Sequence, residues 1–548
     1  MMNPFEKARI GKIEIKNRFV MAPMISNLCN PDGTTNENHI RYLEERARGG
    51  FGLIITEYAY VDEYNGKGSP NEMGIFSREQ LPKLSRLTER IHSAGSKIFV
   101  QLVHAGGKAN PHYNKESIFA PSTVDYLGSL PAEMTKQDIK NVENKFLNAA
   151  EIAYRAGFDG IELHGAHGYL LQEFISPSLN KRQDEYGGST ENRVRIINEI
   201  SDMIRAKLDM PLGIRLSLYE DDEDGYDADY GIEVASMLKN MDYIHFSAGR
   251  FAPPGSSASF YYENVHIGSK LKGKIDKNTM LVGSIRSMQD IEKALKVSDF
   301  VVFGRQALAD PYTPLKMKMD IPYRPCIRCN QACRNLSNAE VRCTINPYTG
   351  FEITQNSSKK YSGEIAIIGS GIKGLEAALY AASMGIKSIV YEKSDFGGQF
   401  NEIIDQYKKR DFMPLLEYYQ SMLKRYGIEI RYESANNGIL CLPDKIYPDI
   451  GRNGDLSIDT NIYRYFDDVL KIAEKNRVIM STRSLHSLER SRIDGYKKIA
   501  EKAGIEFRDM DSYDFKVYDI RQYDILEAMK SGRMAIDQYI LENKTAFL

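Results

Sequence analysis

Short apolar runs alternate with longer amphipathic segments between Arg18 and Arg305. Segments such as 143–158 and 287–297 repeat apolar residues three and four positions apart, which is the helical period. Eight shorter runs have the length and the β-branched content of buried strands: RFVMAPM from Arg18, GLIITEYAYV from Gly52, KIFVQLVHA from Lys97, DGIELHGAH from Asp159, LGIRLSL from Leu212, YIHFSAG from Tyr243, TMLVGSI from Thr279 and DFVVFGR from Asp299. This repeated strand–helix unit predicts an α/β fold whose first domain, residues 1–322, is a (β/α)8 TIM barrel.

Polar residues stand at the carboxyl ends of several predicted strands. They are Gln101, His104, His164, His167, Arg215, Ser247, Gly304 and Arg305. In a TIM barrel this end of the strands carries the active site. Any one of these residues alone could be an ordinary capping residue, but together they predict a site at this end of the barrel.

Four of the six cysteines follow the predicted barrel with the spacing C-x2-C-x3-C-x9-C: Cys326, Cys329, Cys333 and Cys343. Such clustering is unlike a secreted disulfide framework, and Cys29 and Cys441 stand alone. Four thiolates suit iron–sulfur or zinc, but zinc sites usually use two CxxC pairs, which this uneven spacing does not form. We therefore predict that residues 323–361 hold a [4Fe–4S] cluster and a linker, with structural zinc as the alternative.

A third domain is predicted over residues 362–548. It begins with a strand, a glycine-rich turn, a helix and a second strand, EIAIIGSGIKGLEAALYAASMGIKSIVYEK from Glu364. The three glycines of the turn are Gly369, Gly371 and Gly374, and Glu392 ends the second strand. This order is typical of a Rossmann-like dinucleotide-binding domain, in which the acidic residue binds a ribose hydroxyl. Beyond about Asn437 the sequence shows no pattern that predicts a fold.

The amino-acid composition limits the classes of molecule that the protein is expected to bind. Of the 548 residues, 42% are hydrophobic and 27% are charged, as in ordinary globular proteins of two or three domains. Lys and Arg total 72 against 74 Asp and Glu, so the net charge of −2 does not favour nucleic acid or an anionic membrane surface. The N-terminal segment has no apolar signal-peptide core. We expect a cytoplasmic homo-oligomer that acts on a small molecule.

The segment from Gly160 to Arg193 is the most specific in the chain, GIELHGAHGYLLQEFISPSLNKRQDEYGGSTENR. It resembles the H-x-A-H-G-Y-L block of bacterial members of the old yellow enzyme family. Three further motifs extend the resemblance over the whole barrel: MAPM at 21–24, QLVHAGGK at 101–108 and GSI…FGR at 283–305. The cysteine motif with CNQAC, followed by the glycine-rich turn, is similar to the branch that contains 2,4-dienoyl-CoA reductase, 2-enoate reductase and trimethylamine dehydrogenase.

The resemblance implies two flavins and a nicotinamide reductant. By position, FMN is expected at Pro23, Met24, Gln101, Arg215, Gly283, Gly304 and Arg305, the last three around its phosphate. Glycines there would let backbone N–H groups approach a phosphate, and the loops after strands seven and eight are the usual phosphate site of this fold. FAD is expected at Gly369, Gly371, Gly374, Glu392 and Gln399, with NADH or NADPH as the reductant.

The resemblance also implies roles for three residues in the specific segment. His164 and His167 would donate hydrogen bonds to a substrate carbonyl oxygen, and Tyr169 would donate a proton. A metal site at the two histidines is the poorer reading because no third ligand lies nearby in sequence. Packing alone is the alternative for Tyr169. The resemblance therefore favours reduction of an activated C=C bond in an α,β-unsaturated carbonyl compound.

Two departures from the family pattern leave alternatives open. The inserted NADH domain with its own glycine motif is not recognisable, so the C-terminal domain is expected to be shortened, and electrons could come from a separate donor protein. An amine dehydrogenase of the trimethylamine dehydrogenase type is an alternative function, but that pattern has a flavin-linking cysteine where this chain has Ile25, and tryptophan, which this chain lacks. A second alternative is an electron-transfer subunit of a larger complex. The aromatic residues of loop 250–270 suggest an apolar wall, and surface packing or a subunit interface explains them equally well.

Overall fold

The structure is a computed structural model. It describes residues 2–125, 128, 130–220, 224–249, 271, 273–334, 336, 339–352, 361–404, 406–435, 437–441, 455–459, 467, 469–470, 472–474, 477–482, 490–509, 515–516 and 525–543. Loop 250–270 and most of the predicted linker therefore lie outside the described residues.

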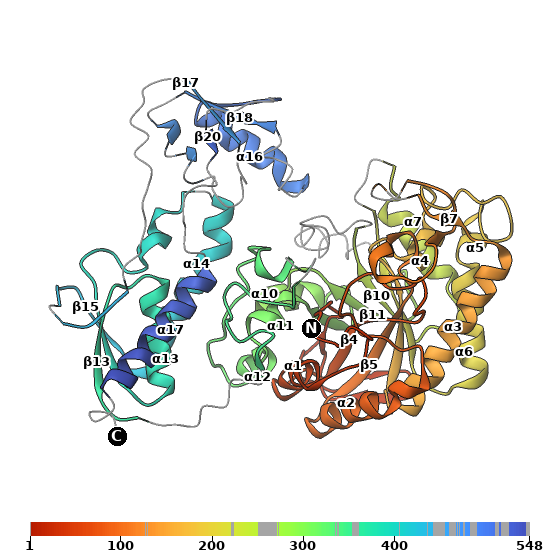
Figure 1. Ribbon diagram of the computed structural model, residues 1–548, viewed down its shortest axis with the longest axis horizontal. Helices are drawn as coiled ribbons and strands as arrows, with labels where there is room; N and C mark the ends of the chain where they lie inside the picture. The colour runs from red at the N-terminus through yellow and green to blue at the C-terminus, as the bar shows by residue number, and fades with distance from the viewer. Residues whose placement is uncertain are drawn as a thin grey trace. The chain divides into compact units, whose positions relative to one another are not determined.

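Eight parallel strands form a closed barrel, in the order β10-β11-β12-β3-β4-β5-β8-β9 (Figure 1). Each strand coincides with one of the eight predicted runs, so the predicted (β/α)8 TIM barrel is confirmed. The strands are β3 Phe19–Met21, β4 Leu53–Tyr60, β5 Lys97–Val103, β8 Gly160–Gly165, β9 Leu212–Ser217, β10 Tyr243–Ser247, β11 Asn278–Val282 and β12 Phe300–Phe303. Nearly every residue of these strands is buried, because one face packs inside the barrel and the other against helices.

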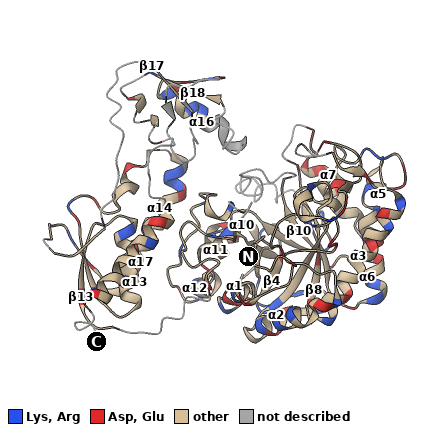
Figure 2. Cartoon of the chain, viewed as in Figure 1, with Lys and Arg blue, Asp and Glu red and all other residues tan. Residues whose placement is uncertain are grey.

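Helices surround the barrel: α1 Glu37–Arg48, α2 Leu81–Ser93, α3 Lys136–Arg155, α4 Leu170–Ile175, α5 Thr190–Arg193, α6 Arg195–Lys207, α7 Ala228–Met237, α10 Met288–Ala294, α11 Arg305–Ala309 and α12 Thr313–Lys318. The helix predicted around 143–158 is α3, which begins earlier because Thr135 and Asp138 form a capping box. Basic and acidic residues, blue and red, intersperse along α3 and α6 (Figure 2), and the Nζ of Lys140 on α3 lies 2.9 Å from the Glu199 carboxylate on α6. Opposite charges thus pair locally on these outer helices.

Two small strand pairs lie outside the barrel. Strands β1, Ala8–Ile10, and β2, Ile13–Ile15, form an antiparallel hairpin. Ile10 and Ile15 belong to one apolar cluster with Phe99, Tyr243 and Phe300 of the barrel strands. The other pair is β6, Phe119–Ala120, with β7, Ala132–Glu133.

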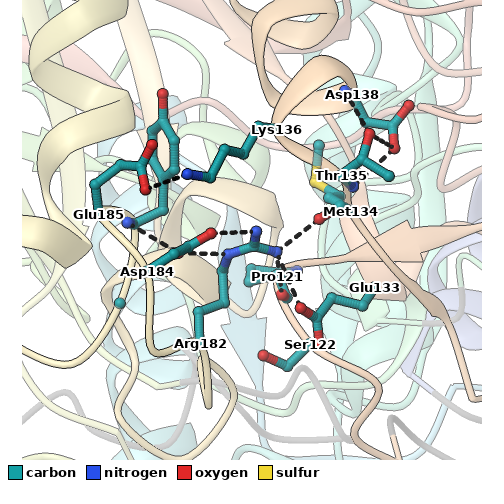
Figure 3. A network of polar contacts seen from close by, with 12 residues as sticks. Pro121, Ser122, Glu133, Met134, Thr135, Lys136, Asp138, Arg182, Asp184 and Glu185 are labelled. Carbon is teal, nitrogen blue, oxygen red and sulfur yellow. Dashed lines mark hydrogen bonds and ion pairs between the residues drawn. The ribbon is translucent and has the colours of Figure 1, made fainter.

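A polar network ties the long segment after β8 to the loop that carries β6 and β7 (Figure 3). Arg182 is buried, and its guanidinium donates to the carbonyl oxygens of Pro121 and Met134 at 3.0 and 2.6 Å. It also forms two hydrogen bonds with the Asp184 carboxylate, at 3.0 and 2.6 Å. The N-x-R-x-D part of the specific segment therefore holds the loops in place, because a bidentate guanidinium fixes its partner's geometry.

Replacing Arg182 with alanine is expected to destabilise the barrel by about 3 kcal/mol, since it leaves Asp184 and two carbonyl groups without their partner. The urea midpoint of unfolding, followed by circular dichroism, measures this. Lys181→Ala is the matched control, because the Lys181 side chain is exposed and donates to the carbonyl oxygen of Pro177, while the bond from its backbone amide to the Ser122 hydroxyl survives the substitution. Equal midpoints for both variants would contradict the assignment.

The chain divides into two compact units: residues 1–321, 332–342 and 348–353 form the first, and residues 322–331, 343–347 and 354–548 the second. In the second unit, four parallel strands have the order β15-β14-β13-β16. They are β13 Glu364–Ile368, β14 Lys387–Tyr391, β15 Glu429–Arg431 and β16 Ile439–Leu440, with α13 Ile372–Ser383, α14 Gln406–Tyr426 and α17 Ile525–Glu542. This strand order is that of a Rossmann-like sheet.

A second parallel sheet of the same strand order follows, which the sequence analysis did not predict. Strands β17 Asp455–Asp459, β18 Arg477–Ser481, β19 Ile505–Arg508 and β20 Phe515–Lys516 have the order β19-β18-β17-β20, with α16 at Arg490–Lys502. The sequence beyond about Asn437 shows no pattern that predicts this sheet. The strands are short, and no glycine occurs between 455 and 494, so neither usual signal of such a domain is present. Its core includes Val478, Met480 and Tyr496.

A buried ion cluster stabilises the second unit around Glu376 of α13. Its carboxylate accepts hydrogen bonds from Arg324 at 3.0 Å, Tyr419 at 2.8 Å and the Nε of Arg533 at 2.7 Å. Burial alone would raise the pKa of Glu376, but the two arginines outweigh it and lower the pKa to about 2. The folded pKa thus lies below the ordinary value of 4.5, so the cluster contributes stability above pH 4.5 that is lost as the pH falls towards 2.

Glu376→Gln is expected to destabilise this unit by about 3–5 kcal/mol near neutral pH, because it leaves two buried arginines without their carboxylate. Thermal unfolding between pH 2 and pH 7 tests this: the wild type should lose stability below pH 4.5, and the variant should show a flatter profile. Glu429→Gln removes an exposed partner of Arg431 in the same unit and serves as the control. Parallel pH profiles for wild type and Glu376→Gln would refute the assigned role.

Among the described residues, no helix combines the length and apolar character needed to cross a membrane.

Candidate active site

The predicted polar residues meet at the carboxyl end of the barrel. Arg215 of β9 donates to the carbonyl oxygen of Pro23 at 3.2 Å and to the Ser247 hydroxyl at 3.2 Å. Ser247 ends β10, and its hydroxyl lies 2.8 Å from the Nε2 of His167. Contacts therefore join the ends of β3, β8, β9 and β10. His104 differs, since its ring nitrogens bond to the Gly106 amide at 3.1 Å and to Asn65 at 3.1 Å and so hold a loop.

His164 and His167 lie side by side at the end of β8. Their ring centroids are 5.2 Å apart, and the rings are nearly perpendicular. His167 adopts a φ of +59° and Gly168 a φ of +74°, which makes the chain turn sharply so that both imidazoles face the site. Burial, followed by the charge of Arg215, lowers the pKa of both histidines well below the ordinary value. Both rings are therefore neutral near pH 7, and each has one N–H to donate.

Tyr169 presents a protonated phenol beside this pair. Its ring centroid lies 5.0 Å from that of His164, and its hydroxyl donates to the Tyr58 hydroxyl at 3.0 Å. Burial raises the pKa of Tyr169 above its ordinary value, so the hydroxyl keeps its proton. Tyr58 was missed in the sequence. It follows a register shift in β4 between Ile55 and Tyr58, and such irregularities re-aim side chains next to active sites.

Buried polar side chains continue the site into the barrel. The Gln101 amide donates to Glu162 at 2.7 Å, and the other oxygen of Glu162 lies 3.0 Å from the Nδ1 of His245. Burial lowers the pKa of Arg215 to about 10, although the Glu162 charge opposes this shift. Sequence analysis missed Glu162 and His245. Both could have been found in the sequence, because a polar residue within an otherwise apolar strand indicates a functional position.

These residues fit a flavin. The buried polar atoms that have no hydrogen-bond partner within the described part of the chain include several at this site: Oε1 of Gln101, Nε of Arg215, Nδ1 of His164 and Nε2 of His245. Buried polar groups are almost always paired, so the barrel end requires a polar ligand. An isoalloxazine ring, with its ring nitrogens and carbonyl oxygens, supplies matching donors and acceptors.

The residues expected around the FMN phosphate follow two neighbouring strands. Gly283 comes directly after β11, and Gly304 and Arg305 come directly after β12. Arg305 donates to the Ser284 hydroxyl at 2.8 Å, which holds the guanidinium at this end of the barrel. Met24 lies against Gly304, where its sulfur would be 3.5 Å from an added Cβ. The predicted phosphate and ring positions therefore adjoin each other.

The four clustered cysteines form no disulfide. Cys329 and Cys343 are buried, while Cys326 and Cys333 are partly buried. The Arg328 amide donates to the Cys326 sulfur at 3.4 Å, and Arg328 and Asn330 have positive φ angles on either side of Cys329. Backbone N–H groups directed at cysteine sulfur are a feature of iron–sulfur ligation. The four-thiolate cluster itself stays a prediction.

The glycine-rich turn in the second unit has the geometry of a dinucleotide site. A Cβ on Gly374 would lie 1.9 Å from the Gly369 carbonyl oxygen, so only glycine permits this close helix–strand packing. A Cβ on Gly371 would meet nothing within 4 Å. Glu392 accepts hydrogen bonds from the amide and hydroxyl of Ser370 at 2.8 and 2.7 Å, and Gln399 lies in the 3₁₀ turn Gly398–Glu402. The nucleotide roles of these residues stay predictions.

Comparisons with known proteins agree with this geometry. The chain is 37% identical over 453 residues to NADH oxidase of Thermoanaerobacter brockii, covering 78% of this chain and 69% of that protein. It is 33% identical over 474 residues to cinnamate reductase of Clostridium sporogenes, covering 79% and 71%. The structure of 6-hydroxypseudooxynicotine amine oxidase from Pseudomonas geniculata N1 superposes with a TM-score of 0.83 at 22% identity, covering 98% of both chains, which shows a shared fold.

A family profile described as the NADH:flavin oxidoreductase / NADH oxidase family matches residues 3–324, which is the whole barrel. This match agrees with the resemblance to the old yellow enzyme family and its 2,4-dienoyl-CoA reductase branch drawn from the sequence. The chain is a flavin oxidoreductase and belongs to the NADH:flavin oxidoreductase / NADH oxidase family.

Proposed function

We propose that the protein is an FMN-dependent ene-reductase that reduces the activated C=C bond of an α,β-unsaturated carbonyl compound. One observation carries the proposal: two neutral imidazoles, His164 and His167, stand beside the protonated phenol of Tyr169. Such a set can hold a carbonyl oxygen and deliver one proton. The similarity to a cinnamate reductase supports this reaction class.

The chain's own residues would act as follows. FMN, when bound, supplies a hydride. His164 and His167 donate N–H groups to the substrate carbonyl oxygen and so draw electron density away from the conjugated double bond. Tyr169 donates its phenolic proton to the α-carbon. Arg215 places positive charge at the flavin position, where reduction adds negative charge.

Electron supply forms the second part of the proposal. Cys326, Cys329, Cys333 and Cys343 would hold a [4Fe–4S] cluster that passes electrons to the barrel. FAD would bind at the Gly369–Gly374 turn, and the similarity to an NADH oxidase supports NADH as the reductant. The second parallel sheet is a further candidate for the nicotinamide, although no glycine motif follows β17. A separate electron-donor protein is the alternative source.

Oxidation of an amine is the competing reaction, because the fold is shared with an amine oxidase. Fold alone does not separate the two reactions. Ile25 stands where the amine-dehydrogenase pattern has a flavin-linking cysteine, and the chain has no tryptophan. These residues favour ene-reduction.

Anaerobic cofactor analysis of the purified protein, followed by assays with reduced enzyme, tests the proposal. We expect FMN, FAD and about four irons per chain, with flavin bleached by NADH and reoxidised by an enone. If dithionite bleaches the flavin and NADH does not, a separate donor protein supplies the electrons. The proposed function would be overturned if no unsaturated carbonyl compound reoxidises the reduced flavin. It would also be overturned if amines reduce the flavin instead.

A further inference from the structure

Lys108 directs its ammonium group at the catalytic turn. It ends the 3₁₀ turn Gly106–Lys108, which follows β5. Its Nζ donates to the carbonyl oxygen of His167 at 2.8 Å and lies 4.6 Å from the ring centroid of Tyr169, within the range of a cation–π contact. This cation therefore touches the turn between the two residues assigned to carbonyl binding and proton donation.

The charge of Lys108 has no carboxylate partner among the residues that the structure describes. Within the described part of the chain, its ammonium group donates to the neutral carbonyl group of His167 and forms no ion pair. The nearby acid Glu173 instead accepts from the Gly107 amide at 2.8 Å, and burial raises the pKa of its carboxyl well above the ordinary value. Burial therefore favours the neutral form of Glu173, which weakens this residue as a counter-charge to Lys108.

The other groups around Lys108 add to the positive field. Burial, followed by the charge of Arg334, lowers the pKa of Lys108 to about 7, and an ionised Glu173 would oppose this shift. His164 and His167 are neutral, and Arg215 contributes a further cation behind them. A partly buried cation without an ion-pair partner is costly, so an anion bound here would relieve that cost.

Apolar side chains lie next to this charge. Tyr58, Tyr60 and Tyr169 belong to one cluster that also contains Ala105 and Ala109, on either side of Lys108 in sequence. Ile25, Phe76 and Ile118 pack against this cluster. A ligand with a carboxylate at one end and an aryl or alkyl group at the other would match both features.

We propose that Lys108 binds the carboxylate of the substrate, so that the enzyme acts on free α,β-unsaturated carboxylic acids in preference to neutral esters. This inference rests on the proposed function, since His164, His167 and Tyr169 act on the same molecule. A carboxylate withdraws electrons less well than an ester, and a cation beside it compensates by stabilising the negative charge that develops during reduction.

Matched substrates test this on the holoenzyme. Cinnamate and methyl cinnamate share one carbon skeleton and differ in charge, so the ratio of their kcat/KM values isolates recognition of the carboxylate. Wild type should favour cinnamate. In Lys108→Met, which keeps the side-chain length and removes the charge, this ratio should fall by roughly 10–100-fold, as for the loss of a charged hydrogen bond. In Lys108→Arg the ratio should change by less than about 5-fold.

The outcomes separate this inference from the proposed function. An equal loss on both substrates in Lys108→Met would show that Lys108 only positions the His167–Tyr169 turn and would overturn the inference. If the wild type reduces the ester but not the acid, the inference about Lys108 is also overturned, whereas ene-reduction as the function is still supported. If neither is reduced and an unsaturated ketone does not reoxidise the reduced flavin either, the proposed function itself would be refuted; reduction of the ketone alone would overturn only the inference.

A binding measurement on the wild type tests the same inference if Lys108→Met does not fold. The saturated acid 3-phenylpropanoate and its methyl ester are titrated against the oxidised enzyme, and perturbation of the flavin spectrum is followed. We expect the acid to bind at least about 10-fold more tightly than the ester. Equal or weaker binding of the acid would overturn the inference.

Discussion

Replacing Tyr169 with phenylalanine is expected to slow reduction of the C=C bond by roughly 10²–10⁴-fold, which is the usual contribution of a positioned general acid. The change removes one hydroxyl group and keeps the ring that packs against His164 and Tyr58. Because the phenol is protonated in the folded protein, its loss removes a proton source without adding a charge. Reduction of the flavin by NADH or dithionite needs no such proton donor and should proceed at the wild-type rate.

Anaerobic rapid mixing separates the two half-reactions, and Tyr58→Phe is the matched control. The Tyr58 hydroxyl accepts from Tyr169 at 3.0 Å, so its removal frees the proton donor without deleting it. We expect the control to lose less than about 10-fold in the oxidative half-reaction, in keeping with one neutral hydrogen bond. Equal slowing of both half-reactions in Tyr169→Phe would leave the tyrosine with a packing role only.

The barrel could be predicted from the sequence because its signal is local. Each strand is a short apolar run bounded by polar residues, and each run coincides with an observed strand. The site followed from the same pattern, since Gln101, His164 and Arg215 sit at strand ends that closure of the barrel brings together. The specific segment after Gly160 added the roles of His167 and Tyr169 by resemblance.

What could not be predicted depends on contacts between distant segments. Glu162 pairs with Gln101 and His245 across three strands, and Tyr58 reaches Tyr169 from β4. The second parallel sheet was missed because its strands are two to five residues long and no glycine motif follows β17. Such a sheet is recognised only when its strands are paired, because each strand alone carries too little pattern.

Changing Cys329 to alanine is expected to remove nearly all of the iron and acid-labile sulfide from the purified protein. A cubane cluster needs four thiolates, and the tight turn around Cys329, with positive φ at Arg328 and Asn330, has no other cysteine to substitute. Iron per chain should fall from about four to below one, and NADH-driven turnover should stop because electrons no longer reach the barrel.

Dithionite distinguishes a broken relay from a broken barrel, since it can reduce the barrel flavin directly. In Cys329→Ala, reduction of an enone should therefore persist with dithionite and fail with NADH. Cys441→Ala is the matched control: Cys441 is also buried in the second unit, and burial raises the pKa of its thiol to about 11, as expected of a cysteine that binds no metal. Its iron content and NADH-driven rate should equal those of the wild type. Retained iron in Cys329→Ala would exclude Cys329 as a ligand, whereas loss of iron in both variants would trace the effect to destabilisation of the second unit.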